Sequence, residues 1–360
     1  MPAPKAKPYI SAITPYVGGK SKAGNATRII KLSSNENPYG PSPAALAAYA
    51  QAADSLHRYP EDGCASLRAA IAARHGFDPA QIICGVGSDE VLGMLVHAYA
   101  GVGDEVVFCE HGFLMYRVYS NQYGATPVAV PERHLRSDVD ALLAAVTDNT
   151  RLMFIANPNN PTGSYITKDD IARLRANLRD DIILVLDGAY AEYMVADDYS
   201  DGRELVLNTN TVITRTFSKV YGLPALRVGW GYGPPHIIDT LYRVRDPFNI
   251  NQPAIAAAIA ALNDIEYTLQ QVALNNAERE RVRRAIEAMG VATHPSVTNF
   301  ILLAFESPKQ AAAINAALLQ RGIIIREVIN YGLPHCLRMS IGTASENDAF
   351  LAALAESLAL

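Results

Sequence analysis

Residues 182–187 are Ile-Ile-Leu-Val-Leu-Asp, and this stretch decides the fold. Its five apolar residues follow one another without the polar and apolar alternation of a strand that has one wet face. A strand covered on both faces is typical of a mostly parallel sheet between two layers of helices. Further β-rich runs alternate with helical patterns around it, at residues 81–84, 105–110, 152–156 and 211–217. This alternation indicates βαβ units and predicts a doubly wound α/β fold.

The pattern changes after residue 250. The sequence predicts a long connecting helix over residues 264–289, with Gly290 where helices commonly end in the left-handed conformation. The elements that follow are apolar runs at 299–304, 322–325 and 337–341 and an alanine-rich last helix. They predict a second, smaller α+β unit packed closely against the first. The expected parts are an N-terminal arm (1–40), a large domain (41–255) and a small C-terminal domain (256–360).

Composition excludes several classes of protein. The 360 residues are 49% hydrophobic and 19% charged, which is ordinary for a globular protein and unlike a disordered one. A net charge of −5 without any Lys/Arg-rich run argues against nucleic acid or an anionic membrane as partner. The longest apolar stretch, residues 254–262, is about half of what a bilayer-spanning helix needs. Four scattered cysteines without a C-x-x-C pair favour reduced thiols, a cytoplasmic location and no metal site, and no export signal is indicated.

A glycine-rich turn, Gly85-Val86-Gly87-Ser88-Asp89-Glu90, leaves one predicted strand and opens a helix. Free backbone N–H groups and the helix dipole favour an anion there, so the turn predicts a phosphate site. A simple helix cap by Ser88 is an equally good interpretation. Because Glu90 stands where the nicotinamide fingerprint needs glycine or alanine, that cofactor is not indicated.

Asp187 ends the buried strand and places a carboxylate at the mouth of the sheet, where ligands of such folds bind. Burial of this charge is costly unless a cation pairs with it, and a protonated pyridine nitrogen is such a cation. For a lone Asp after a strand, a carboxylate that caps a helix is the more common case. Tyr190 is by default a core or surface residue, but its hydroxyl can reach a ring oxygen of the same ligand.

Lys219 closes another β-rich run, Thr-Arg-Thr-Phe-Ser-Lys at residues 214–219. Most lysines are solvated surface charges, yet a partly desolvated amine has the lowered pKa that Schiff-base chemistry needs. Ser218 and Arg227 are residue types that hold a phosphate. Residues 157–163 (Asn-Pro-Asn-Asn-Pro-Thr-Gly) by themselves indicate only a turn after a strand. The gathering of such side chains at successive strand ends predicts a ligand site.

With these segments the sequence resembles the fold type I aminotransferases, which use pyridoxal 5′-phosphate. The likeness extends over nearly the whole chain. The motifs that carry it are Ser34-Asn35-Glu36-Asn37-Pro38-Tyr39-Gly40-Pro41, Arg58-Tyr59-Pro60, Gly87-Ser88-Asp89-Glu90, Asn159-Asn160-Pro161-Thr162-Gly163, Asp187-Gly188-Ala189-Tyr190, Ser218-Lys219 and Cys336-Leu337-Arg338. The resemblance implies pyridoxal 5′-phosphate as the cofactor, held by the large domain.

The resemblance also implies a role for each residue of the cofactor site. Lys219 corresponds to the lysine that bonds covalently to the cofactor and then shuttles the substrate proton. Asp187 corresponds to the partner of the pyridinium nitrogen. Asn160 and Tyr190 correspond to residues that hydrogen-bond the phenolic oxygen of the ring. The phosphate is expected to bind Ser218, Arg227, Thr216 and the amides near Ser88 and Asp89.

Two aromatic residues complete the expected cofactor site. Tyr59 corresponds to a tyrosine that family members lend to the phosphate of the neighbouring subunit, so the resemblance implies a homodimer. Phe113 stands where an aromatic residue, usually tyrosine, stacks on the cofactor ring, and the change keeps the stacking but loses any hydroxyl contact. The segment 109–113 (Cys-Glu-His-Gly-Phe) also lacks the proline of the usual form, so a different loop geometry is expected there.

Arginines are expected to select the substrate. Arg338 corresponds to an arginine that clamps a substrate carboxylate, and Arg326 to a second one that helps to bind the phosphate of histidinol phosphate. Tyr16, in residues 14–17, and Asn37, in the segment Asn35–Asn37, resemble the lid of that pocket. Without the resemblance, a surface or interface ion pair is the default interpretation of either arginine.

The resemblance thus implies a reversible ping-pong transamination between L-histidinol phosphate and 2-oxoglutarate, which gives imidazole acetol phosphate and L-glutamate. Transamination of phenylalanine or tyrosine, alone or as a second activity, stays open because related members share these motifs. A non-catalytic effector-binding protein of the same fold is the alternative from another class. The intact lysine, aspartate and phosphate-binding set argues against that alternative.

Overall fold

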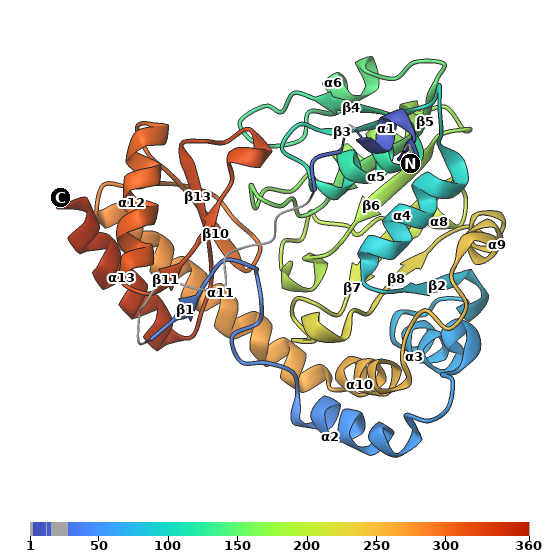
Figure 1. The fold of residues 1–360 in the computed structure, drawn as a ribbon, viewed down its shortest axis with the longest axis horizontal. Coiled ribbons are helices and arrows are strands. Elements are labelled where there is room, and N and C mark those ends of the chain that lie inside the picture. Colours follow the sequence, from blue (N-terminus) through green and yellow to red (C-terminus); the bar gives the residue numbers. More distant parts are fainter. Residues whose placement is uncertain (1–2, 12, 16–27, 360) are drawn as a thin grey trace.

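The computed structural model describes residues 3–11, 13–15 and 28–359. A large lobe holds a central sheet with helices on both sides, and the C-terminal elements form a smaller lobe beside it (Figure 1). Residues 16–27 lie outside the described residues, and the predicted lid residue Tyr16 is among them.

The helices of both lobes alternate with the strands along the chain. Within the described residues, the α-helices are α1 (Pro8–Ser11), α2 (Pro43–Ala52), α3 (Ala65–His75), α4 (Ser88–Tyr99), α5 (Met115–Tyr123), α6 (Val139–Ala144), α7 (Lys168–Asn177), α8 (Arg203–Val206), α9 (Pro235–Val244), α10 (Gln252–Asn263), α11 (Ile265–Ala288), α12 (Pro308–Gln320) and α13 (Ala344–Leu358). Short 3-10 turns are η1 (Ala53–Ser55), η2 (Asp62–Cys64), η3 (Pro79–Gln81), η4 (Ala191–Tyr193), η5 (Pro224–Leu226) and η6 (Ile329–Tyr331). Many helices begin where a Ser, Thr, Asp or Asn oxygen accepts a backbone N–H of the first turn, as Thr343 does for α13.

The large lobe is built on a seven-stranded sheet. Its strands, in spatial order, are β2 (Ile82–Gly85), β8 (Gly229–Tyr232), β7 (Thr211–Thr216), β6 (Ile183–Asp187), β5 (Thr150–Ala156), β3 (Glu105–Cys109) and β4 (Thr126–Val130). Strand β8 is antiparallel to both of its neighbours, and all other pairs are parallel. The predicted α/β fold with a mostly parallel central sheet is therefore confirmed.

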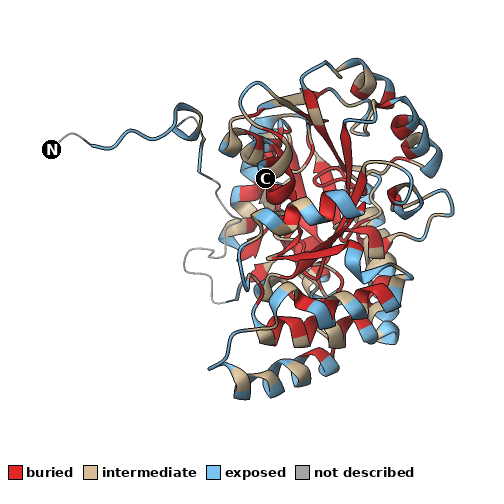
Figure 2. Cartoon of the chain, turned by 90° about the vertical axis from the view of Figure 1, so that its right-hand side faces the viewer, coloured by how far each residue is buried: buried red, intermediate tan, exposed pale blue. Residues whose placement is uncertain are grey.

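Strand β6 explains why the sheet needs helices on both faces. Ile183 and Val185 pack into one hydrophobic cluster, with residues of α4, α5 and α9. Leu184 and Leu186 pack into another, with residues of α3, α7 and α10. Since successive side chains of a strand point to opposite faces, an unbroken apolar run requires an apolar layer on each side. Figure 2 shows the result, with buried residues concentrated in the strands and exposed residues on the outer helices.

Parallel pairing brings polar strand ends to one edge of the sheet. Asp187, the last residue of β6, is opposite Ala156 on one side and Thr214 on the other. On the next strand pair, Thr216 is opposite Gly229 of β8. A Cβ on Gly229 would lie 2.1 Å from the backbone nitrogen of Ser88, so only glycine lets the N-terminus of α4 come this close to the sheet. Asp187, the β7 end and the α4 N-terminus therefore meet at this edge.

The smaller lobe combines C-terminal strands with a strand from near the N-terminus. Its antiparallel sheet has the order β12 (Arg326–Glu327), β13 (Cys336–Ser340), β10 (Phe300–Ala304) and β9 (Ala292–His294). Strand β1 (Ile30–Lys31) pairs in parallel with β11 (Ile323–Ile324). Ile30 and Leu32 belong to the same hydrophobic cluster as Phe350 of α13. A strand from near the N-terminus and the last helix of the chain thus share one core, although α1, which precedes β1, packs against α5 of the large lobe.

Helices α10 and α11 connect the two lobes. Helix α10 packs against α2 and α3 of the large lobe, whereas Val282 and Ile286 of α11 belong to the core of the smaller one. Gly290 follows α11 with φ +83°, the left-handed conformation predicted for it. The division into domains at residue 255 stays a prediction. No helix in the described part of the chain combines the length and the apolar character that a bilayer crossing requires.

Truncation of Leu184 should measure how much the two-sided burial of β6 stabilises the protein. Leu184 is fully buried, so Leu184→Ala leaves a cavity and should lower the free energy of unfolding by about 2–4 kcal/mol. Leu207→Ala, at a leucine that is 68% exposed, should change it by less than about 0.5 kcal/mol. Urea unfolding can be followed through Trp230, the only tryptophan, which is buried in β8. Equal effects of both substitutions would contradict the packing described here.

Candidate active site

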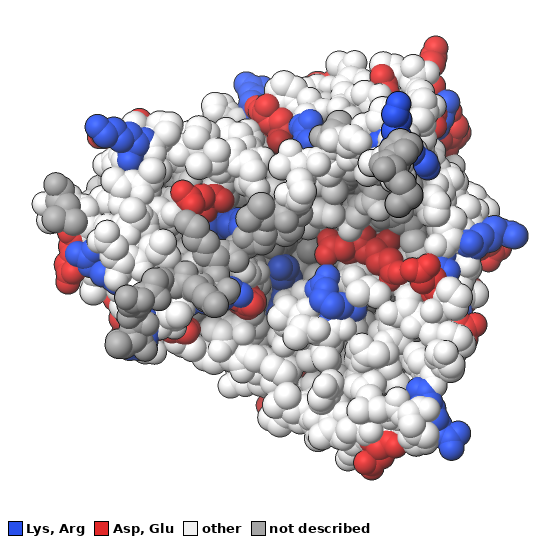
Figure 3. Space-filling view, in the orientation of Figure 1, with Lys and Arg blue, Asp and Glu red and all other residues white. Residues whose placement is uncertain are grey.

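A cavity of about 240 Å³ lies at the polar edge of the large sheet. It is lined by Ser34, Glu36, Ser88, Asp89, Phe113, Ala156, Pro158, Asn160, Asp187, Ala189, Tyr190, Thr216, Ser218, Lys219, Pro224 and Arg227. In the space-filling view the surface is hollowed between the lobes, and basic and acidic atoms lie close together beside the hollow (Figure 3). The cavity therefore lies where ligands of open α/β sheets bind.

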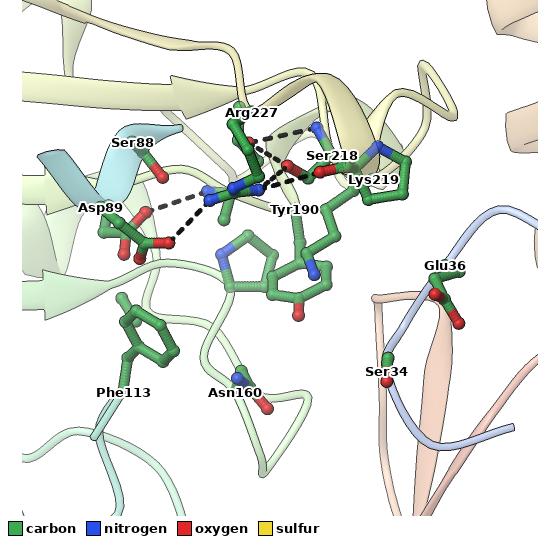
Figure 4. A pocket seen from close by; sticks show the side chains of 16 residues that line it. Ser34, Glu36, Ser88, Asp89, Phe113, Asn160, Tyr190, Ser218, Lys219 and Arg227 are labelled. Carbon is green, nitrogen blue, oxygen red and sulfur yellow. Dashed lines mark hydrogen bonds and ion pairs between the residues drawn. The ribbon is translucent and has the colours of Figure 1, made fainter. Parts of the chain in front are cut away.

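The structure brings together every residue predicted for the cofactor site except Tyr59. These residues come from the ends of several strands and from the start of α4, and they face the same space (Figure 4). Ser34, which was not predicted to line the site, and Glu36, which lies in the predicted lid segment Asn35–Asn37, enter from the segment after β1 on the side opposite Phe113. They belong to the Ser34–Pro41 motif, which was the available signal.

Lys219 follows β7 and points its amine into the cavity (Figure 4). The amine lies 5.5 Å from the centre of the Tyr190 ring. Burial, followed by the positive charge of Arg338, lowers the pKa of Lys219 to about 8. At pH 7 about one in ten of these amines is thus uncharged, far more than for an ordinary lysine, and the uncharged amine is the form that attacks an aldehyde. The surface-charge interpretation of Lys219 does not apply.

Asp187 is held by three hydrogen bonds at the bottom of the site. Its carboxylate accepts from the Tyr116 hydroxyl at 2.8 Å, from the Thr214 hydroxyl at 3.2 Å and from the Ala189 N–H at 3.2 Å. Burial nevertheless raises the pKa of Asp187 to about 6. A cation bound beside the carboxylate would offset that burial, so the site fits the protonated ring nitrogen of pyridoxal 5′-phosphate.

Tyr116 and Thr214 were not predicted as site residues. Tyr116 is fully buried and stacks on Phe154 of β5, with ring centres 4.8 Å apart. Burial raises its pKa well above the ordinary value, so its hydroxyl remains a donor to Asp187. The only sequence signal for Tyr116 was its place one helical turn after Phe113.

The opposite end of the cavity is built for an anion. Helix α4 begins at Ser88, and its cap residue Gly87 has φ +78° and offers no side chain to the first turn. The guanidinium of Arg227 donates to Ser218 Oγ at 3.1 Å and to Asp89 Oδ2 at 3.1 Å. A Cβ on Gly87 would lie 2.5 Å from Arg227 Nη2 and would push this guanidinium aside, and the positive φ of Gly87 independently favours glycine there. The open helix start, hydroxyls and guanidinium fit the phosphate of pyridoxal 5′-phosphate.

Arg338 and Arg326 lie on neighbouring strands of the smaller lobe. The register of β12 and β13 sets the two residues opposite each other, so their side chains leave the same face of the sheet. Arg338 is buried, donates to the Ser33 carbonyl at 3.0 Å and makes a short hydrogen bond to Asn160 Oδ1. Because Asn160 lines the cavity, Arg338 is joined directly to the site. Neither arginine lines the cavity itself.

Three other predicted features lie at the margin of the site or outside it. Asn37 does not line the cavity and donates to the Val220 carbonyl at 2.8 Å, beside Lys219. Tyr59 is 84% exposed and stacks on Phe248, with ring centres 4.9 Å apart. In the segment that lacks the usual proline, His111 Nδ1 lies 2.6 Å from the carbonyl oxygen of Tyr331, which joins the Phe113 loop to the smaller lobe.

Comparisons with known proteins agree with this arrangement. The family described as aminotransferase class I and II matches residues 27–354. A histidinol-phosphate aminotransferase of Dinoroseobacter shibae is 53% identical over 350 residues, which cover 97% of this chain and 96% of the relative. One of Rhodospirillum rubrum is 51% identical over 359 residues, which cover 99% of this chain and 97% of the relative.

A solved structure is also similar over almost the full length. It is the crystal structure of histidinol-phosphate aminotransferase from Sinorhizobium meliloti in complex with pyridoxal 5′-phosphate. The two chains are 32% identical, and their structures agree with a TM-score of 0.93 over 99% of this chain and 98% of the other.

The lowered pKa of Lys219 should be visible in cofactor loading. Protein freed of cofactor should combine with pyridoxal 5′-phosphate about tenfold faster for each pH unit up to about pH 8, and then at a constant rate. The growth of absorbance after mixing measures this rate. Lys219→Ala should bind the cofactor without the absorbance band of cofactor that is bonded covalently to a lysine. A rate that still rises tenfold per unit through pH 9 would mean that the amine is not desolvated.

Proposed function

The chain belongs to the aminotransferase class I and II family, and on this basis we propose that it transfers the amino group of L-histidinol phosphate to 2-oxoglutarate. It is a transferase of fold type I that depends on pyridoxal 5′-phosphate. The products are imidazole acetol phosphate and L-glutamate, a step of histidine biosynthesis. One observation supports the choice of substrate, namely that Arg326 pairs with Arg338, whose guanidinium donates to Asn160 of the cavity wall.

The cofactor supplies an aldehyde for the amino group and a ring that accepts electrons. Lys219 would hold the cofactor covalently and, once released by the substrate, its amine would accept the proton from the substrate carbon and pass it to the former aldehyde carbon of the cofactor. Asp187 keeps the ring nitrogen charged, because its own burial favours a cation beside it. Tyr116 and Thr214 hold the Asp187 carboxylate in place. Each of these tasks uses a group that the fold already positions.

Binding of the cofactor uses the remaining side chains of the cavity. Ser88, Ser218, Thr216 and Arg227 bind the phosphate, together with the open backbone N–H groups at the start of α4. Asp89 pairs with Arg227 and so orients the guanidinium. Phe113 covers one face of the ring, and Asn160 and Tyr190 approach its phenolic oxygen. The carboxylate of Asp89 lies beside Lys219 as well, where it partly offsets the effect of Arg338 on the amine.

Two guanidinium groups allow one pocket to accept two unlike substrates. L-histidinol phosphate has a phosphate and no carboxylate at its reacting carbon, whereas glutamate has two carboxylates. Arginine binds both kinds of oxyanion through paired N–H donors. Arg326 takes the phosphate or the distal carboxylate, and Arg338 takes the carboxylate next to the reacting carbon.

Removal of the Arg326 guanidinium should affect L-histidinol phosphate and phenylalanine differently as substrates. Arg326→Ala should lower kcat/KM for L-histidinol phosphate by about 10- to 100-fold, the effect of one lost charge-assisted contact. The value for phenylalanine should change by less than about threefold. Arg284→Ala, at an arginine whose side chain is 73% exposed on α11, is the matched control and should change neither value. A protein that prefers phenylalanine from the start would instead be an aromatic aminotransferase.

We also infer that the active form is a homodimer that works in the cytoplasm. Large apolar side chains are exposed on α2, after it, before α10 and at the start of α11. They are Leu46, Tyr49, Leu56, Tyr59, Phe248, Ile265 and Leu269. Water contact with so many apolar groups is unfavourable, so a second copy of the chain is expected to cover them and to receive Tyr59 at its phosphate site. The four cysteines are free and buried, as suits a reducing compartment.

Charges placed on this surface should separate the subunits. The double variant Leu46→Glu/Leu56→Glu should sediment near the chain mass of 38.9 kDa, whereas the parent protein should sediment at about twice that mass. Val102→Glu is the control, because Val102 is 79% exposed on a different part of the large lobe. Monomeric parent protein with full activity would contradict the proposal.

A further inference from the structure

Asn35 is a buried residue that no role proposed so far uses. It lies in the segment between β1 and α2, is 1% exposed and has φ +54°. Asparagine adopts this left-handed conformation more readily than most residues. Its amide Nδ2 donates to the hydroxyl oxygen of Tyr190 at 2.7 Å. A side chain of the N-terminal segment thus contacts a tyrosine of the cavity wall.

The smaller lobe fixes the orientation of the Asn35 amide. Ser340 Oγ, at the end of β13, donates to Asn35 Oδ1 at 2.9 Å and accepts the backbone N–H of Asn35 at 2.8 Å. Asn299 donates to the Asn35 carbonyl at 2.9 Å. Because the amide oxygen is occupied by Ser340, the amide NH₂ faces Tyr190. The chain of donors therefore runs from Ser340 through Asn35 to Tyr190.

The direction of the hydrogen bond from Asn35 to Tyr190 decides whether the Tyr190 hydroxyl can donate to a further partner. A phenol oxygen that accepts from Asn35 keeps its own proton for another partner. The ring of Tyr190 is fixed edge-on against Phe300, with centres 5.3 Å apart, and the residue lines the cavity. We propose that Asn35 is a positioning residue that turns the Tyr190 hydroxyl proton toward the cavity and so makes Tyr190 a hydrogen-bond donor to the phenolic oxygen of the cofactor. The inference rests on the proposed function.

The groups around Tyr190 keep its hydroxyl protonated, so that the hydroxyl can donate a hydrogen bond. Burial raises its pKa to about 12, although Arg338 and the hydrogen bond from Asn35 act in the opposite direction. Asp187 and Asp89 raise the pKa further. The hydroxyl therefore keeps its proton at neutral pH. The amine of Lys219 lies over the face of the same ring, 5.5 Å from its centre.

A donor at the phenolic oxygen stabilises the negative charge of that oxygen and weakens its hold on the proton of the lysine–cofactor bond. Tyr190→Phe should therefore raise the pH at which the absorbance of the lysine-bound cofactor titrates, by about one unit. Ser340→Ala frees the Asn35 amide to rotate and should raise this titration pH by about half a unit. Asn35→Asp, which keeps the backbone preference, presents only acceptors to Tyr190 and should raise it by about one unit.

The double variants decide whether these effects pass through Tyr190. In the Tyr190→Phe background, Ser340→Ala should shift the titration by less than about 0.2 units, because the hydroxyl on which it acts is absent. The same background measures the part of the Asn35→Asp shift that is due to its charge alone. Ser357→Ala is the matched control, at a buried serine of α13 that donates only to the Ala353 carbonyl among the contacts seen here.

Two further measurements separate the possible failures. Thermal unfolding of each variant without cofactor shows whether it folds, and the dissociation constant of the cofactor shows whether the site is intact. Equal titrations of the parent protein and the Ser340→Ala and Asn35→Asp variants, or additive shifts in the double variants, would overturn the role of Asn35 and leave the transaminase assignment standing. Absence of lysine-linked absorbance in the parent protein would overturn the proposed function itself.

Discussion

The buried carboxylate of Asp187 is the constraint on which the site depends. It is 4% exposed at the end of the central strand, and three donors from three different elements do not fully compensate its burial. Such a group is stable when a cation sits beside it. The stacked Tyr116 and Phe154 rings and the hydroxyl of Thr214 are arranged around this charge. Much of the sheet edge can therefore be understood as support for one ion pair with a ligand.

The sequence predicted the parts of the fold that follow a local pattern. The apolar run at β6 is covered on both faces, as its composition requires. Strands β4 and β8 show no such pattern. Pro127 is tolerated in β4 because this strand is at the edge of the sheet, and β8 is Gly-Trp-Gly-Tyr because α4 approaches its first glycine closely. These requirements come from neighbours in space, so neither strand could be recognised from its own residues.

The same distinction holds for the site. Residues that end strands, such as Asp187 and Lys219, were visible as polar groups after apolar runs. The hydrogen bonds from Tyr116 to Asp187 and from Asn35 to Tyr190 were not visible, because these partners lie 71 and 155 positions apart along the chain, although Asn35 itself belongs to the Ser34–Pro41 motif. A hydrogen bond between distant segments leaves no periodicity in either one. The resemblance to a family supplied the roles of single residues, while the geometry supplied the contacts that support them.

The pairing of β1 with β11 has a consequence for biosynthesis. Ile30 and Ile323 are partners, although they lie 293 positions apart along the chain. During translation, the segment around Ile30 is made before the large sheet but finds its partner strand only after residues 323 and 324 have left the ribosome. The large sheet, whose strands span residues 82–232, can form meanwhile. The smaller lobe is therefore completed after the large sheet. A chain that terminates before β11 leaves the apolar side chains around Ile30 without their partner strand, where they favour aggregation.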